Sequence, residues 1–149
     1  MNGDDAAGNR VILDTNVLLS AVFFGGVPRG IVDAWQRGLV TLVLSAEILA
    51  EYARAGAALS RRYAGSAAHL EPILAAVAQT ALVVDAPPLP RSISPDPDDD
   101  KFLACPLAAD VRTIVSGDKP LRSVSGWAGI EILSPRAFVD RYLGPAPAR

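Results

Sequence analysis

Residues 10–14, "RVILD", form a short apolar run that ends in an aspartate. A run of β-branched and apolar residues without polar alternation is typical of a strand buried on both faces. The next segment, "TNVLLSAVFFGG" (15–26), places Leu18, Leu19, Val22 and Phe23 on one helical face and stops at two glycines. A buried strand followed directly by such a helix predicts the first unit of an α/β fold.

The rest of the chain repeats this alternation. We predict further strands over residues 39–45, 81–85, 112–118 and 130–133, and helices over residues 27–38, 46–55, 66–79, 101–110 and 134–143. Strands that alternate with helices build a parallel sheet that is covered on both faces. A proline-rich stretch between residues 87 and 97 predicts an extended surface loop before the helix that begins at residue 101.

The composition limits the classes of protein that this chain can belong to. With 149 residues, half of them apolar, it is long enough for one domain with a full core, which we expect over residues 10–143 with flexible tails at 1–9 and 144–149. A net charge of −2 argues against a protein that coats nucleic acid by bulk charge. The first residues lack the basic start and apolar core of a signal peptide, and no apolar run approaches the roughly 18 residues of a membrane span. We therefore expect a soluble, cytoplasmic protein.

Two residue types that often carry catalysis or metal binding occur only once. Cys105 is the only cysteine, which excludes an intrachain disulfide and a cysteine-based zinc site. His69 is the only histidine, which excludes paired-histidine acid–base chemistry and histidine-rich metal centres. We expect His69 to be a surface or partly packed residue and not a general base.

Four carboxylates from distant segments are expected to meet at one edge of the sheet. Asp14 and Asp118 follow predicted strands, and the carboxyl ends of parallel strands lie at the same edge. Asp100 lies in the first turn of the helix that leads into strand 112–118, and Glu51 flanks the apolar stripe of helix 46–55. Oxygen ligands without histidine or cysteine favour Mg²⁺ or Mn²⁺. Such an ion with open water positions suits the hydrolysis of phosphate esters.

Each of these residues also has a purely structural interpretation. Asp14 could cap the following helix, and Asp118 could belong to a turn after its strand. Glu51 could be an ordinary exposed helix glutamate. Asn16 is compatible with a local cap or with a place in the site. The combination of the four carboxylates, and not any one of them, indicates a metal site.

The stretch "SPDPDDDKF" (94–102) needs an explanation of its own, because four of its residues are closely spaced aspartates. Two unit charges about 4 Å apart at a protein surface repel each other by roughly 4 kcal/mol. We assign Asp96 to the turn, and Asp98 and Asp99 to favourable interactions with the helix dipole. Asp100 is the member of the cluster that we expect to bind metal.

Four motifs in this order resemble the PIN-domain nuclease family, in particular its VapC-like toxin branch. "VILDTNVLLSA" is similar to the family's opening strand and Asp-x-Asn motif, and "SAEILAEY" to its second motif, with Glu51. "DPDDDKFLA" resembles the third motif, with Asp100 on the acidic position, and "TIVSGDKPL" the fourth, with Ser116 and Asp118. The resemblance covers roughly residues 10–143.

The resemblance implies a three-layer α/β/α sandwich on a mostly parallel sheet of about five strands. It implies Mg²⁺- or Mn²⁺-dependent cleavage of RNA, a homodimer, and an antitoxin that inserts a segment into the active-site groove. Asp14, Asp100 and Asp118 would hold the metal, with Glu51 binding a second ion or a metal-bound water, and Asn16 and Ser116 positioning ligands or the phosphate. The cationic residues expected to steer the RNA backbone are Arg54, Arg61, Arg62, Lys119 and Arg122.

Two prolines depart from the family pattern. Pro106 removes the backbone hydrogen bond to the carbonyl of Phe102, so we expect a kinked or shortened helix after Asp100. Pro120 replaces a residue that is often acidic in the family, which removes a further ligand there.

Three other functions compete with the nuclease interpretation. A haloacid-dehalogenase-type phosphatase needs a second aspartate two residues after Asp14, where this chain has Asn16. A Rossmann-like nucleotide binder needs a glycine-rich loop after the first strand, and none follows. A catalytically silent PIN-fold module that binds RNA or protein stays open as the alternative, although the acidic set is complete.

Overall fold

The computed structural model describes residues 10–144, and the side chains of residues 66 and 67 are outside this description. Apart from Gly144, the predicted tails at residues 1–9 and 144–149 therefore lie outside the described residues. The centre is a five-stranded sheet in the order β3-β2-β1-β4-β5. Every neighbouring pair is parallel, as predicted. The strands are β1 (Arg10–Leu13), β2 (Thr41–Ser45), β3 (Leu82–Val84), β4 (Thr113–Val115) and β5 (Glu131–Leu133).

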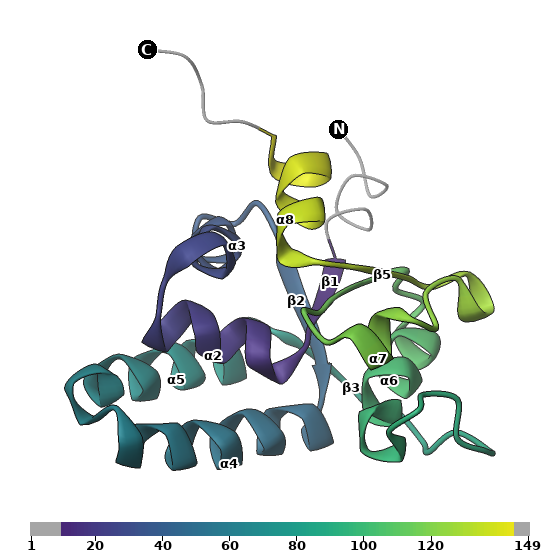
Figure 1. Ribbon diagram of the computed structural model, residues 1–149, viewed down its shortest axis with the longest axis horizontal. Helices are drawn as coiled ribbons and strands as arrows, with labels where there is room; N and C mark the ends of the chain where they lie inside the picture. Colours follow the sequence, from purple (N-terminus) through teal and green to yellow (C-terminus); the bar gives the residue numbers. More distant parts are fainter. Residues whose placement is uncertain (1–9, 145–149) are drawn as a thin grey trace.

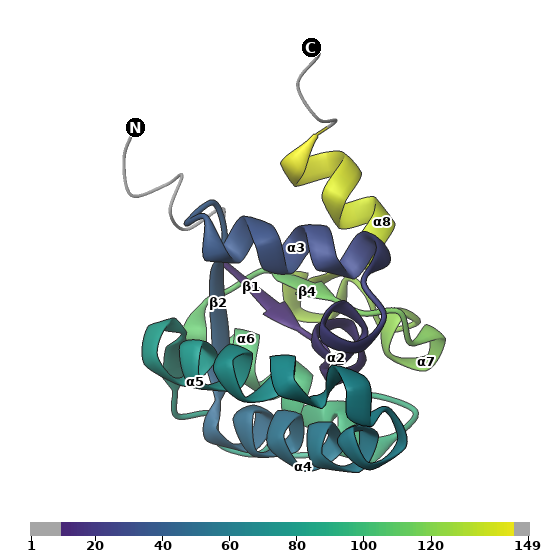
Figure 2. The same ribbon diagram turned by 90° about the vertical axis from the view of Figure 1, so that its left-hand side faces the viewer.

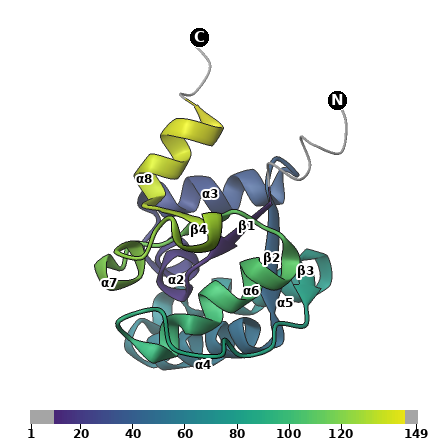
Figure 3. The same ribbon diagram turned by 90° about the vertical axis from the view of Figure 1, so that its right-hand side faces the viewer.

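Helices cover both faces of this sheet, so the predicted α/β sandwich is confirmed (Figure 1). In Figure 2 the helices α2, α3 and α5 lie in front of β1 and β2, and in Figure 3 α6 lies over the opposite face. The α-helices are α2 (Thr15–Phe23), α3 (Gly26–Gln36), α4 (Ala46–Arg62), α5 (Leu70–Thr80), α6 (Lys101–Ala109), α7 (Lys119–Arg122) and α8 (Pro135–Phe138). Short 3₁₀ turns η1 (Ala64–His69), η2 (Pro97–Asp100) and η3 (Trp127–Gly129) and the π-helical turn η4 (Val139–Leu143) complete the chain.

The buried strands explain why the apolar runs lack polar alternation. Val11, Ile12 and Leu13 of β1 are almost fully buried, as are Ile114 and Val115 of β4. Both strands lie inside the sheet and have helices over both faces, so side chains pointing either way are removed from water.

Three local features differ from the sequence prediction. Helix α4 continues to Arg62, beyond the predicted end at residue 55, because Gly56 is buried against neighbouring helices and does not end it. The one-turn helix α7 was not predicted; Asp118 caps it and Pro120 stands in its first turn. Pro106 does not end α6, which runs on to Ala109, so the expected shortening is wrong.

Among the described residues, no single helix has the length and apolar character of a membrane span. Only α2 and α3 taken together reach that length and composition, and they are bent by 96° relative to each other.

The close approach of α4 to α2 and α5 generates a stability prediction at Gly56. A methyl group added there would lie 2.8 Å from Cδ2 of the buried Leu70 and 3.5 Å from Cδ2 of Leu19. Overpacking a core costs about 1–3 kcal/mol, which exceeds the gain of up to about 1 kcal/mol from replacing a helical glycine by alanine. We expect Gly56→Ala to lower the free energy of unfolding, measured by urea denaturation.

Gly30→Ala is the matched control for this prediction. Gly30 also lies inside a helix, α3, but its added methyl group would meet no atom within 4 Å. This substitution should raise the free energy of unfolding by about 0.5–1 kcal/mol. Equal effects at both glycines would contradict the packing described for α4.

Candidate metal and phosphodiester site

The site lies where the strand order of the sheet reverses direction. β1 lies between β2, the next strand along the chain, and β4, which follows much later, so the carboxyl ends of β1 and β4 border a topological switch point. Asp14 directly follows β1, and its backbone N–H donates to the carbonyl of Val115 at the end of β4 (2.9 Å). Ser116 and Asp118 come next in the chain after β4. The fold thus brings two of the predicted carboxylates to one edge.

Ser116 connects these two carboxylates. Its hydroxyl is fully buried, donates to Oδ2 of Asp14 (2.7 Å) and accepts from the backbone N–H of Asp118 (3.0 Å). The carboxylate of Asp118 also accepts from the N–H of Leu121 (3.3 Å), so Asp118 caps α7 as well. The side chain of Asp14, in contrast, makes no capping hydrogen bond to α2. Helix capping therefore explains part of the role of Asp118, but it does not explain the position of the Asp14 carboxylate.

Asp14 is an unusual carboxyl group because only 5% of its surface is exposed. Burial raises its pKa above the ordinary value, since the charged form loses hydration. The hydrogen bond from Ser116 and the nearby backbone N–H of Thr15 oppose this rise, and the negative charges of Asp118 and Glu51 add to it. The net rise in pKa therefore comes mainly from burial, with a smaller contribution from the neighbouring carboxylates.

The third carboxylate of this group is Asp99 and not the predicted Asp100. Burial is the largest cause that raises the pKa of Asp99, to about 7, and the charges of Asp14, Asp118 and Asp96 follow. Hydrogen bonding between the carboxyl groups of Asp99 and Asp118 is a further, smaller cause that raises the pKa of Asp99. The pKa of Asp99 therefore responds to the charges of Asp14, which follows β1, and of Asp118, which follows β4.

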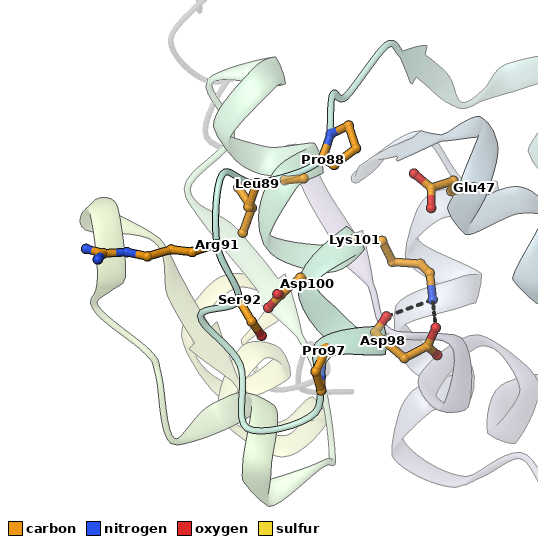
Figure 4. Close-up of a pocket in the computed structure, with 10 residues that line it drawn as sticks. Glu47, Pro88, Leu89, Arg91, Ser92, Pro97, Asp98, Asp100 and Lys101 are labelled. Carbon is orange, nitrogen blue, oxygen red and sulfur yellow. Dashed lines mark hydrogen bonds and ion pairs between the residues drawn. The ribbon is translucent and has the colours of Figure 1, made fainter.

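The carboxylate of Asp100 serves the preceding loop instead. It accepts from the backbone N–H of Ser94 (2.8 Å) and from the N–H of Ile93 (3.2 and 3.3 Å to its two oxygens). In Figure 4 it lies beside Ser92, in the same loop. Asp100 therefore fastens the proline-rich loop to the start of α6, and its role as a metal ligand stays a prediction.

The other two aspartates of the cluster also have partners within the chain. Asp96 caps η2 by accepting from the N–H of Asp98 (3.0 Å), as the turn assignment predicted. Asp98 pairs with Lys101 (3.2 Å). Asp99 had been assigned to the helix dipole together with Asp98, and that assignment is corrected for Asp99 alone.

Glu51 lies beside the group and is neutralised by a lysine that the sequence analysis missed. Its Oε1 accepts from Nζ of Lys101 (2.5 Å), and its Oε2 accepts from the hydroxyl of Thr15. Lys101 is only 10% exposed; burial lowers its pKa, but the bonds to Glu51 and Asp98 outweigh that effect and raise it. The only sequence signal for this role was its place directly after the aspartate cluster.

The remaining predicted site residues are less closely involved. Asn16 is exposed on the first turn of α2 and forms no side-chain hydrogen bond with another described residue. Arg54 and Lys119 are exposed, whereas Arg122 is half-buried and its Nε has no partner among the described residues. Arg61 and Arg62 lie at the far end of α4, three turns from Glu51.

The donor set fits a hard divalent cation. As the side chains are arranged, no three ligands among residues 10–144 surround a common point. The charge of Asp118 nevertheless adds to the raised pKa of Asp14, the charges of Asp14 and Asp118 add to that of Asp99, and Lys101 already neutralises Glu51. A bound cation would remove this mutual repulsion, and carboxylate oxygens are the ligands that Mg²⁺ and Mn²⁺ prefer.

A pocket of about 250 Å³ opens beside this acidic turn (Figure 4). Its lining combines apolar side chains of the proline-rich loop with charged residues at the start of α4 and around the start of α6. The lining residues labelled in Figure 4 are Glu47, Pro88, Leu89, Arg91, Ser92, Pro97, Asp98, Asp100 and Lys101. Asp14, Asp99 and Asp118 do not line it. The pocket therefore borders the carboxylate group without containing it.

The raised pKa of Asp99 generates a prediction about pH and stability without metal. An unfolded aspartate has a pKa of about 3.9, so between about pH 4 and pH 7 the native chain binds more protons than the unfolded chain. The free energy of unfolding should therefore fall as the pH rises through this range. We expect Asp99→Asn to weaken this pH dependence, measured by urea denaturation in EDTA from pH 4.5 to pH 8.

Asp98→Asn is the control for this measurement, because Asp98 is the exposed neighbour of Asp99. Its pH dependence between pH 4.5 and pH 8 should follow that of the unmodified protein. A slope that is the same with and without the Asp99 carboxyl group would show that Asp99 does not titrate near neutral pH.

Comparison with known proteins gives the same family as the motifs. A model of the PIN domain matches residues 10–120, from β1 into the first turn of α7, and this range contains Asp14, Glu51, Asp99 and Asp118. No curated protein matches the chain. The PIN domain is a nuclease fold, and PIN nucleases typically use divalent metals. The matched range covers well over half of the sequence, and the chain therefore belongs to the PIN domain family.

Proposed function

We propose that this protein is a Mg²⁺- or Mn²⁺-dependent endoribonuclease that hydrolyses RNA phosphodiester bonds. The observation that carries the proposal is the grouping of Asp14, Asp99 and Asp118, with raised proton affinity at Asp14 and Asp99, at the switch point of the sheet. Such a group is costly unless it binds a cation or serves in proton transfer. Membership of a nuclease family makes metal binding the better-supported explanation.

Asp14, Asp99 and Asp118 would hold the metal in this proposal. A divalent ion bound there supplies a water of lowered pKa and neutralises charge on the phosphate. Ser116 fixes the orientation of the Asp14 carboxylate, because its buried hydroxyl donates to Oδ2. Thr15 and Lys101 hold Glu51 at the margin of the group, and the charge of Lys101 balances that of the partly buried Glu51 carboxylate. From this position Glu51 would orient a water.

Two exposed cations near this edge support a nucleic-acid substrate. Arg54 lies one turn beyond Glu51 on α4, and Lys119 directly follows Asp118. Cations of this kind attract the phosphate backbone independently of sequence. Because the net charge of the chain is −2, the attraction must be local to this surface.

We further propose that the protein is a VapC-like toxin of the cytoplasm that forms a homodimer and is inhibited by a cognate antitoxin. The resemblance of the four motifs supports this assignment. An inhibitory peptide with a cationic side chain would find in Asp14, Asp99 and Asp118 the same uncompensated charge that a metal ion would.

The central test is cleavage of an RNA panel of tRNA, rRNA fragments and unstructured RNA with Mg²⁺, Mn²⁺ or EDTA. We expect cleavage that requires metal, and a loss of more than about 100-fold in Asp14→Asn, Asp99→Asn and Asp118→Asn. Asp98→Asn, the exposed neighbour, should stay within a few-fold of the unmodified protein. Ser116→Ala should lose about 10–100-fold, since it disturbs the orientation of Asp14 and not the ligand itself.

Cleavage that persists in EDTA or in Asp14→Asn would refute the proposed mechanism. No cleavage and no metal binding would leave the alternative, a catalytically silent PIN-fold module that binds RNA or protein.

Metal binding can be tested without activity by thermal unfolding. A cation competes with protons for Asp14 and Asp99, and the pKa of Asp99 is about 7. Mg²⁺ or Mn²⁺ should therefore raise Tm more at pH 8 than at pH 5.5, because ligand binding to the native state stabilises it. Asp99→Asn should lose this rise, whereas Asp98→Asn should keep it. An equal rise in Tm for both variants would place the metal elsewhere.

A further inference from the structure

An exposed group of aromatic side chains lies at the end of α2 and α4 that is remote from the carboxylates. Phe24 is 61% exposed and Tyr63 is 38% exposed, although large apolar side chains are usually covered. Their rings meet edge to face with centroids 5.1 Å apart, and the guanidinium of Arg62 lies 5.6 Å from the centroid of Tyr63. Phe23 is buried beneath them, 6.4 Å from each ring. The rings therefore rest on the core and face solvent.

The two helices that carry this group also carry the candidate site. α2 and α4 run side by side in the same direction (Figure 1). The hydroxyl of Thr15 binds Glu51 near their first turns, and Phe24 contacts Tyr63 just beyond their last turns. Arg62 is eleven residues after Glu51, which is three helical turns, so the two residues lie on the same face of α4 about 16 Å apart.

The surface between the site and the aromatic group is neutral or cationic. Ser20, Ala55 and Ala58 lie at helical spacing between the two ends and are at least partly exposed, and none of them is acidic. Neither Arg54 nor Arg62 forms an ion pair with another described residue. Their charges are therefore available to a phosphate backbone.

We propose that Phe24, Tyr63 and Arg62 form a platform on which an unpaired base of the RNA substrate stacks while the phosphate to be cut lies at the carboxylate site. This inference rests on the proposed ribonuclease function and deepens it by assigning a base-stacking subsite at the end of α2 and α4 that is remote from the carboxylates. Aromatic rings stack on any base, and arginine adds both a planar face and a charge for the phosphate. A base within a duplex has both faces covered and cannot bind in this way.

The charges favour RNA over a protein as the occupant of this surface. Protein interfaces also gather aromatic and arginine side chains, so these residue types alone do not decide between a protein and RNA. What favours RNA is the cationic Arg62 beside the Tyr63 ring, together with a neutral or cationic surface that continues from the aromatic group to a site belonging to a nuclease fold. A protein that covers the platform is therefore the competing outcome of the test.

The test measures how affinity depends on RNA length, by fluorescence anisotropy of labelled oligouridines of 4 and 12 nucleotides. Asp14→Asn protein in Mg²⁺ serves as the background, so that the probes stay intact. We expect the 12-mer to bind at least about tenfold more tightly than the 4-mer, and Phe24→Ala and Tyr63→Ala each to remove about tenfold from the 12-mer affinity. Tyr63→Leu keeps the apolar contact with Phe23 and should lose affinity as well. Arg62→Gln should reduce the salt dependence of binding.

The chain offers a closely matched control at Tyr142. This ring is 41% exposed, lies 5.1 Å from Phe138 and has the guanidinium of Arg141 at 5.8 Å, but it is on η4. Tyr142→Ala should leave the affinity for both oligomers unchanged. An equal loss at Tyr63 and Tyr142, or binding of a 12-base-pair duplex as tight as that of the single strand, would overturn the platform.

The remaining outcomes separate this proposal from the proposed activity. If the unmodified protein cuts RNA but Phe24→Ala and Tyr63→Ala keep the 12-mer affinity, the platform is refuted and the nuclease stands. If the 12-mer affinity falls in these variants while the unmodified protein cuts no RNA, the platform is supported and the hydrolytic activity is refuted. A change in oligomeric state by light scattering without a change in RNA affinity would assign the patch to a protein interface and overturn the platform.

Discussion

Parallel pairing of β1 with β4 brings the side chains of Asp14 and Ser116 within 2.7 Å of each other, although 102 residues separate them in the chain. The hydrogen bond between these two residues is buried, and the backbone of Asp14 adds a second bond to the end of β4. The same hydroxyl accepts from the backbone of Asp118, which fixes the start of the loop that carries the next carboxylate. A different order of strands would separate these groups, so the site depends on this one pairing.

The negative charges of the site are balanced unevenly by neighbouring groups, and this distinguishes Glu51 from Asp14 and Asp99. Glu51 has a lysine and a hydroxyl as partners, and its charge is balanced within the chain. Asp14 and Asp99 are partly or wholly buried, face other carboxylates, and hold their protons more strongly than free aspartate. The protein therefore carries a local electrostatic cost at the carboxyl edge of the sheet. Costs of this kind persist where the surrounding structure fixes the groups, and they occur most often at functional sites.

Asp99 and Asp100 illustrate how neighbouring residues of one type acquire different roles. Asp100 accepts three backbone contacts from Ile93 and Ser94, which closes the proline-rich loop onto the start of α6. The pKa of Asp99, in contrast, is raised by the charges of Asp14 and Asp118. Because the loop passes directly beside the acidic turn, Asp100 contributes to the site by holding its border in place.

The sequence by itself determined the α/β class, the parallel sheet, and the positions of Asp14 and Asp118 at strand ends, because apolar runs and their terminal aspartates are local patterns. It also indicated Glu51 through its motif. It did not determine which aspartate of the cluster faces the site, since η2 is a tight 3₁₀ turn in which each residue points about 120° from the last. That choice depends on where the Ile93–Ser94 backbone folds back, and this is a tertiary contact. The pairing of Lys101 with Glu51 and the meeting of Phe24 with Tyr63 were likewise decided only when helices far apart in the chain packed together.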